Sequence, residues 1–240
     1  MPGADEHRAS PERPATASTT YDQRYYARRY TPATGRDAVW REIVSYLQAR
    51  FFPRAGTVLD LAAGYCSFIN HVNARERHAL DISGSTEQYA APGVTAHTRS
   101  CTDLSPFADG SVDLVFASNL FEHLERADLE QTLREVRRIL SPGGRLIAMQ
   151  PNFRYAYREY FDDYTHLQIF TDRSLADLFA VCGLPAIHVM PRFMPFSFGS
   201  KLPAHPLLVR CYLHSPWKFR GGQMLIVAAH EPLESEAAHA

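Results

Sequence analysis

Residues 133–146 read Leu-Arg-Glu-Val-Arg-Arg-Ile-Leu-Ser-Pro-Gly-Gly-Arg-Leu, and this stretch carries the clearest signal about the fold. Its apolar residues stand three or four positions apart and continue a pattern that begins at Leu129, which predicts one face of a long helix. Ser141-Pro142-Gly143-Gly144 should end that helix, because proline and glycine both interrupt helical hydrogen bonding. The apolar run 145–150 then predicts a strand.

The same alternation of strand and helix patterns continues on both sides of this stretch. Apolar residues at helical spacing predict further helices at 39–47, 68–72 and 171–182, the last with Thr171 as N-cap and Gly183 at its end. Strands are predicted at 57–61, 77–82, 94–97, 112–117, 145–150, 186–190 and 223–229. Strands that alternate with helices predict an α/β fold, with a parallel sheet covered by helices on both faces.

Composition excludes several classes of protein. Hydrophobic residues make up 45% of the 240 residues and charged residues 21%, which excludes a wholly disordered chain. Lys and Arg number 25 and Asp and Glu 26, so the charge balance argues against a nucleic-acid partner. The apolar run 224–229 is too short to span a bilayer, and no secretion signal is visible. We expect a cytoplasmic protein with no membrane partner.

The four cysteines include no Cys-x-x-Cys pair, so their spacing indicates neither a disulfide framework nor a tetrahedral zinc site.

The end of the first strand has the features of a ligand-binding turn. It reads Val-Leu-Asp-Leu-Ala-Ala-Gly-Tyr-Cys-Ser-Phe over residues 58–68, and the small residues Ala62, Ala63 and Gly64 would let the backbone approach a ligand closely. The second strand ends in Asp81, whose carboxylate can accept hydrogen bonds from both hydroxyls of a ribose. Ligands of such sheets bind at the carboxyl ends of the strands.

Together these segments resemble the class I S-adenosylmethionine-dependent methyltransferases, roughly from Tyr21 to Ala229. The first-strand turn and Asp81 carry the resemblance, along with segment 111–119, Glu122-His123-Leu124 and the stretch 133–146. It implies a Rossmann-like sheet of seven mostly parallel strands with an antiparallel last strand, and S-adenosyl-L-methionine as cofactor. Residues 64–70 further resemble a bacterial subgroup associated with sugar, glycan or natural-product pathways.

The resemblance implies which residues contact the cofactor. Asp81 would bind the ribose, and Asp60 would reach the methionine amino group or order the loop. The family has glycines where Ala62 and Cys66 stand, and its acid beside the adenine aligns with either Cys101 or Asp103. The full set of expected contacts is Asp60, Ala62, Ala63, Gly64, Tyr65, Asp81, Ile82, Cys101, Thr102, Asp103, Ser118 and Asn119.

Simpler interpretations stand beside these roles. Asp60 could only cap the next helix, and Asp81 could be a surface turn acid. Tyr65 and Cys66 could be core residues, since free cysteines are commonly buried. Ser118 and Asn119 could form a polar strand end.

Residues 150–155 and 160–167 mix aromatic side chains, two carboxylates and a histidine on the expected substrate side. A hydroxyl acceptor must lose its proton as it attacks the methyl group, so a base is needed. We expect His166, oriented by Asp162 or Asp163, to be that base, with His123 as second candidate. Alternatively, His166 is a core histidine bonded to backbone. Glu122 and His123 could be surface residues, or one of them could shape the substrate pocket or, as the resemblance implies for some relatives, support a metal. We expect no metal, because no second pair of ligands lies nearby in sequence.

The resemblance also suggests a domain plan. Residues 1–20 and 231–240 would be disordered tails around a single domain at 21–230. Within it, 21–50 would form a helical lid over the cofactor, and 151–170 and 191–222 would be insertions on the substrate side. The expected substrate contacts are Tyr26, Asn152, Tyr155 and Tyr164.

The predicted function is methyl transfer from S-adenosylmethionine to a small molecule or sugar intermediate, at oxygen, by in-line displacement. Two alternatives keep the fold: a non-methylating step such as a cyclisation, or a non-catalytic cofactor-binding partner. A nicotinamide-dependent oxidoreductase is disfavoured, because the three-glycine dinucleotide turn is absent from the sequence.

Overall fold

The computed structural model describes residues 35–195, 205–218 and 220–230, all within one compact unit. The predicted tails at 1–20 and 231–240 lie outside the described residues. So do the part of the predicted lid before residue 35 and Tyr26.

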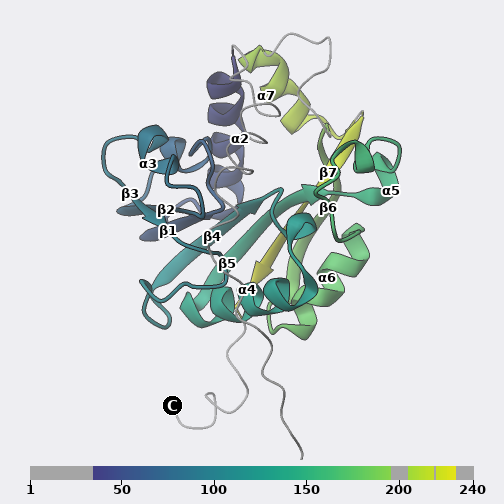
Figure 1. The fold of residues 1–240 in the computed structure, drawn as a ribbon. Helices are drawn as coiled ribbons and strands as arrows, with labels where there is room; N and C mark the ends of the chain where they lie inside the picture. Colours follow the sequence, from purple (N-terminus) through teal and green to yellow (C-terminus); the bar gives the residue numbers. More distant parts are fainter. Residues whose placement is uncertain (1–34, 196–204, 219, 231–240) are drawn as a thin grey trace, which may run out of the picture. The chain divides into compact units, whose positions relative to one another are not determined.

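The sheet has seven strands in the order β3-β2-β1-β4-β5-β7-β6 (Figure 1). The strands are β1 Thr57–Leu61, β2 Glu76–Asp81, β3 Val94–Thr98, β4 Val112–Ser118, β5 Leu140–Pro151, β6 Ala186–Pro195 and β7 Gly221–Ala229. Strands β1 to β5 pair in parallel, whereas β7 runs antiparallel to both β5 and β6. The predicted class, a mostly parallel sheet with an antiparallel last strand, is confirmed.

Helices cover both faces of the sheet, with α4 and α6 on one face and α2 on the other (Figure 1). The α-helices are α2 Arg36–Phe51, α3 Thr86–Tyr89, α4 Arg126–Ile139, α5 Phe153–Ala156, α6 Asp172–Val181 and α7 Pro206–His214. Short 3-10 turns are η1 Ile69–His71, η2 Phe121–His123 and η3 Tyr160–Asp162.

Strand β5 shows how the sequence builds two cores. Leu146 and Ala148 pack in the core beneath α4 and α6, while Ile147 and Met149 pack in the core beneath α2. Because successive side chains of a strand point to opposite faces, a strand with helices on both sides must be apolar at every position. The continuous apolar run in the sequence is the result.

Helices α4 and α6 form as their patterns predict. Leu129, Leu133, Val136 and Ile139 make the buried face of α4. Thr171 caps α6 through a capping box with Ser174.

Three predicted boundaries were wrong. Residues 68–72 form only the short turn η1, because Cys66 is left-handed at φ 54° and Val72 is already extended. The Ser141–Gly144 segment ends α4 but belongs to β5, where Leu140 pairs with Val112. Strand β6 runs on to Pro195 rather than ending at Met190, because Met194 still pairs with Gln223 of β7.

The expected substrate-side insertion 191–222 is mostly regular structure where it is described. Helix α7 packs against α2, where the Arg210 guanidinium makes two bonds of 2.8 and 3.0 Å to the Glu42 carboxylate. Within the described residues no helix is both long and apolar enough to cross a membrane.

Candidate active site

The parallel strands β1, β2 and β4 end at the same edge of the sheet, and the loops that follow them carry the candidate site. The loop after β1 has three left-handed residues, Ala62, Gly64 and Cys66, at φ 59°, 50° and 54°. These alternating left-handed residues fold the chain back, so that the Gly64 N–H reaches the end of β2.

Asp81 joins the loops after β1 and β2. Its carboxylate is 3% exposed and accepts hydrogen bonds from Gly64 N and Ser83 N, each at 2.8 Å. A carboxylate has lone pairs for about four hydrogen bonds. Asp81 can therefore organise both loops and still accept from ribose hydroxyls.

Asp81→Ala should weaken binding of S-adenosylhomocysteine by about 10- to 100-fold, since hydrogen bonds to a charged group contribute roughly 1.5–3 kcal/mol. Calorimetric titration measures this. Asp113→Ala is the matched control, because Asp113 also accepts from two backbone N–H groups, Gly56 and Thr57, but at the opposite end of β1. Equal losses of affinity in the two variants would contradict a cofactor role for Asp81.

Asp60 orders the loop after β1. It is buried, and the Ile69 N–H at the start of η1 donates to its carboxylate at 3.3 Å. Burial raises the pKa of Asp60, although the Ile69 hydrogen bond opposes the shift. The interpretation of Asp60 as a cap therefore agrees with its bond to the Ile69 N–H. Contact of Asp60 with the methionine amino group stays a prediction.

Cys66 lies in the core rather than at the loop surface. Its side chain is fully buried in the cluster beneath α2, and its thiol donates to Thr86 O at 3.7 Å. Burial raises the pKa of the thiol to about 12, so it is a neutral packing group. The interpretation of Cys66 as a core residue therefore fits the structure.

Ala62→Gly should stabilise the protein by roughly 0.5–1 kcal/mol, because a left-handed L-residue costs about 1–2 kcal/mol and the added flexibility of glycine offsets part of the gain. The adjacent Ala63 has no positive φ. Ala63→Gly should therefore destabilise by roughly 0.5–1 kcal/mol. Urea unfolding of both variants measures the difference, and a loss of stability in Ala62→Gly would show that the left-handed backbone carries no strain there.

The other expected cofactor contacts have varied surroundings. The Tyr65 ring lies 4.6 Å from the Tyr89 ring, and Ile82 is half exposed. At the end of β4, the Asn119 side-chain amide donates to Ser118 Oγ at 3.2 Å and its carbonyl accepts from Gln223 at 3.0 Å. Their cofactor contacts stay predictions.

Both residues that could align with the acid beside the adenine make side-chain contacts within the protein. Asp103 pairs with Arg99 at 2.5 Å, and hydrogen bonds from Ser105 contribute most to lowering its pKa. Cys101 accepts from Thr132 of α4 at 3.4 Å, and the Thr102 N–H donates to Ser100. The alignment stays open.

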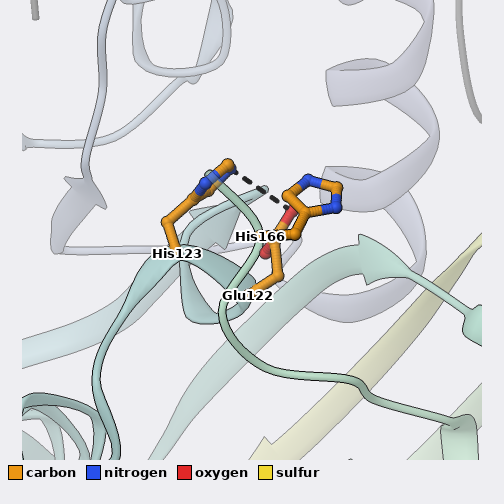
Figure 2. A group of neighbouring side chains, drawn as sticks. All are labelled: Glu122, His123 and His166. Carbon is orange, nitrogen blue, oxygen red and sulfur yellow. Dashed lines mark ion pairs between the residues drawn. The ribbon is translucent and has the colours of Figure 1, made fainter. Parts of the chain in front are cut away.

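A polar centre lies where the loop after β5 crosses η2. The backbone carbonyl of Glu122 accepts from Leu167 N at 2.7 Å and Gln168 N at 3.0 Å, which holds that loop in place. His166 is thereby brought to His123, with 4.9 Å between ring centroids, although the two are far apart in sequence. Figure 2 shows Glu122, His123 and His166 gathered together.

A hydrogen-bonded chain fixes the tautomer of His123. The Thr165 hydroxyl donates to Asp163 Oδ1 at 2.6 Å and lies 2.9 Å from His123 Nδ1. A hydroxyl has one proton, and here that proton points to Asp163. His123 Nδ1 must then be the donor toward Thr165, which leaves the ring's lone pair on Nε2.

The two candidate bases differ in accessibility. The His166 side chain is 4% exposed, against 24% for His123. His166 Nε2 lies 4.0 Å from Asp163 Oδ2, and its ring packs 4.5 Å from that of Tyr160. Asp163, not Asp162, is the carboxylate beside the histidines. This geometry favours His123 over our first candidate, His166.

Glu122 is the group that sequence reasoning undervalued. Its carboxyl is buried, and burial, aided by the nearby charge of Asp163, raises its pKa to about 8. Neither oxygen makes a hydrogen bond within the described part of the chain. Thr165 was missed entirely, and only its spacing from Asp163, typical of a polar turn, could have drawn attention to it.

The expected substrate contacts separate into different environments. Asn152 is fully buried, and its amide donates to Asp172 at 2.9 Å and to Pro191 O at 3.0 Å. These bonds occupy both amide hydrogens and anchor the start of α5, and a substrate contact of Asn152 stays a prediction. The Arg192 guanidinium lies 4.2 Å from the Tyr155 ring centroid, and Tyr164 is exposed.

Comparison with known proteins agrees with this architecture. Residues 59–148 match the family model described as Methyltransferase domain. The malonyl-(acyl-carrier protein) O-methyltransferase of Methylococcus capsulatus is 32% identical over 187 residues, covering 70% of this chain and 67% of that enzyme. The dimethylglycine N-methyltransferase of Parasynechococcus marenigrum is 31% identical over 111 residues, or 41% of this chain and 39% of that one.

A solved S-adenosylmethionine-dependent methyltransferase from Thermotoga maritima shares the fold at a TM-score of 0.60. It is 18% identical, and the match covers 88% of this chain and 95% of that one. The family match, the relative covered over two thirds of its length and the solved structure agree with one another. The chain therefore belongs to the class I S-adenosylmethionine-dependent methyltransferases, and it is an enzyme that uses S-adenosylmethionine as cofactor.

Proposed function

We propose that this enzyme methylates a hydroxyl oxygen of a small molecule, such as a sugar or a glycan intermediate. The observation that carries the proposal is the chain Asp163–Thr165–His123 beside the end of β4. It presents a histidine lone pair at the sheet edge where ligands of this fold bind. A hydroxyl is the kind of acceptor that needs such a group, because it carries a proton that must be removed.

The reaction is an in-line displacement. The acceptor oxygen forms a bond to the methyl carbon as the bond from that carbon to sulfur breaks, and the bonding electrons stay on sulfur. The positive sulfonium thereby becomes the neutral thioether of S-adenosylhomocysteine. The hydroxyl proton moves to His123 Nε2, while the contact with Thr165 keeps Nδ1 as the donor. The chain's main contribution is to hold the reacting atoms in line.

On the cofactor side, Asp81 would bind the ribose, and the loop of Ala62, Ala63 and Gly64 would pass beside the methionine part. Asp60 supports this role by holding the loop against η1. Ser118, the last residue of β4, and Asn119 after it would also contact the cofactor. His166 remains in the proposal as a supporting group for His123.

A second candidate is methylation of a carboxylate, because the Methylococcus capsulatus relative is a malonyl-(acyl-carrier protein) O-methyltransferase. A carboxylate is already deprotonated at neutral pH. That reaction would give His123 no proton to accept. The two candidates therefore differ in whether turnover needs the histidine.

The test is to incubate the protein with S-adenosylmethionine and three acceptor sets: free and nucleotide-linked sugars, malonyl-(acyl-carrier protein), and dimethylglycine. Mass spectrometry would measure methylated product and S-adenosylhomocysteine. We expect a methyl ether of a hydroxyl compound. A methyl ester or a methylated amine as the sole product would overturn the proposal, and methylated product of any kind would exclude the alternatives of a non-methylating step and a non-catalytic partner.

The sugar-related subgroup, the role in natural-product biosynthesis and the cytoplasmic location stay predictions from the sequence.

A further inference from the structure

We propose that Glu122, His123 and His166 bind a divalent transition-metal ion such as zinc, cobalt or iron (Figure 2). One ligand atom from each of the three side chains lies within 4.8 Å of the others. In a tetrahedral site with ligands about 2.0–2.2 Å from the ion, the ligand atoms are roughly 3.3–3.6 Å apart. The three side chains would therefore have to move together by up to about 1 Å to close on an ion. Imidazole together with carboxylate suits ions of this kind better than magnesium.

The spacing of Glu122 and His123 fits an ion better than a direct bond. Glu122 Oε1 and His123 Nε2 are 3.9 Å apart, which is too long for a hydrogen bond. Both Glu122 oxygens are buried without a hydrogen-bond partner in the described part of the chain. Burying a carboxylate in this way is costly unless a proton or a cation neutralises it. A bound ion would supply that charge.

The surroundings of His123 are those of a metal ligand. Metal-binding histidines almost always donate their other ring N–H to a carboxylate, a carbonyl or water, which fixes the tautomer. Here the Nδ1–H of His123 donates to Thr165, and the Thr165 hydroxyl donates onward to Asp163. The Nε2 atom, which carries the lone pair, is the ring nitrogen that lies 3.9 Å from Glu122 Oε1.

His166 is also held in a fixed position, by ring packing and by the backbone bonds of its segment. Its ring is packed between those of Tyr160 and His123, at 4.5 and 4.9 Å between centroids. The two backbone bonds from Leu167 and Gln168 to Glu122 O fix the segment that carries it. The three side chains are thus held near one another before any ion arrives, so that only a small closing movement is needed to bind one.

The structure also contains a histidine pair that does not form such a site. His78 Nδ1 and His97 Nε2 are 3.1 Å apart and bond directly to each other on β2 and β3. Within the described residues, Glu122, His123 and His166 are the only group of three or more such side chains at ligand spacing.

Three protein ligands leave a coordination position open on an ion that takes four or more. This part of the inference rests on the proposed function and deepens it. An acceptor hydroxyl bound at the open position would be acidified by the ion. The hydroxyl proton would then pass to solvent water rather than to His123, whose lone pair would be on the ion, and the substrate class would be hydroxyl compounds able to bind a metal.

The test uses the full chain, stripped with a chelator and dialysed, and titrated with Co²⁺, Zn²⁺ and, for comparison, Mg²⁺. We expect one Co²⁺ or Zn²⁺ per chain, a visible Co²⁺ absorption spectrum, and much weaker Mg²⁺ binding. Glu122→Gln and His166→Gln should each lose the spectrum and the stoichiometric binding. Thr165→Val should weaken affinity by about 10- to 100-fold. His97→Gln, the matched control, should bind like the parent protein.

Absence of stoichiometric Co²⁺ or Zn²⁺ binding, or unchanged binding in Glu122→Gln, would overturn the metal site. If Glu122→Gln does not fold, as judged by circular dichroism, His166→Gln supplies the same decision. Metal-stripped protein that methylates a hydroxyl acceptor at the full rate would overturn the ion's role in the reaction and leave the proposed function standing. Failure to methylate any hydroxyl, with or without ion, would overturn the proposed function, while the titration would still decide the site.

Discussion

His123→Gln should lower kcat by about 10²- to 10⁴-fold, the range for loss of a group that accepts a proton in the transition state. The affinity for S-adenosylhomocysteine should change by less than about twofold, because the interaction with His123 concerns the acceptor rather than the cofactor. Glutamine keeps a polar side chain of similar length but cannot accept a proton at neutral pH. The same loss is expected whether His123 acts as base or holds an ion.

Initial rates with the acceptor found in the product screen, together with calorimetric titration of the cofactor product, measure the two quantities. His97→Gln replaces another partly buried histidine that stands on β3 and should leave both unchanged. Thr165→Val should lower kcat with little effect on KM, because it only releases the orientation of His123. If cofactor affinity falls in parallel with kcat in His123→Gln, the residue is structural and the assignment fails.

The fold, and the placement of Asp60 and Asp81 at one edge of the sheet, could be predicted because their signals are local. The continuous apolar run of β5 and the spacing of apolar residues in α4 can each be recognised within one segment. Asp60 and Asp81 were found because parallel strands must end at a common edge, so position along a strand already gives position in space.

The polar centre around His123 could be predicted only in part, because the path of the loop after η3 decides which side chains come together there. Asp163 and His123 were named, but their connection passes through Thr165, which no pattern singled out. A metal was not expected because no further ligands lie near Glu122 and His123 in sequence. Two backbone bonds to Glu122 bring His166 to them from a separate segment.

Burial was the other quantity that the sequence did not reveal. Asn152 has a polar side chain that could bind a ligand, yet its amide donates to Asp172 and Pro191 O at the start of α5. The loop after β1 also contains a residue whose burial the sequence did not show. Its departure from the glycine pattern at Cys66 is accommodated by turning the side chain into the core, while the backbone keeps the left-handed conformation.

Phe116→Ala should reduce the free energy of unfolding by about 3–5 kcal/mol, the usual cost of removing a fully buried phenylalanine. Phe116 of β4 is 1% exposed, and its ring stacks on that of Phe68 at 3.8 Å between centroids. It also meets Trp40 of α2 edge to face at 6.2 Å. The ring therefore joins the middle of the sheet, the covering helix and the segment that leads into η1.

This position couples stability to the cofactor site. Phe68 lies one residue before η1, whose first N–H is held by Asp60, so a cavity at Phe116 should loosen the loop that passes the cofactor. We expect S-adenosylhomocysteine to bind Phe116→Ala more weakly, and saturating ligand to recover part of the lost stability through mass action. Urea unfolding with and without the ligand measures both effects. Phe161→Ala, at a ring that is 57% exposed, should change stability by less than about 0.5 kcal/mol. A similar small change in Phe116→Ala would mean that the stacked pair does not hold the loop against the sheet.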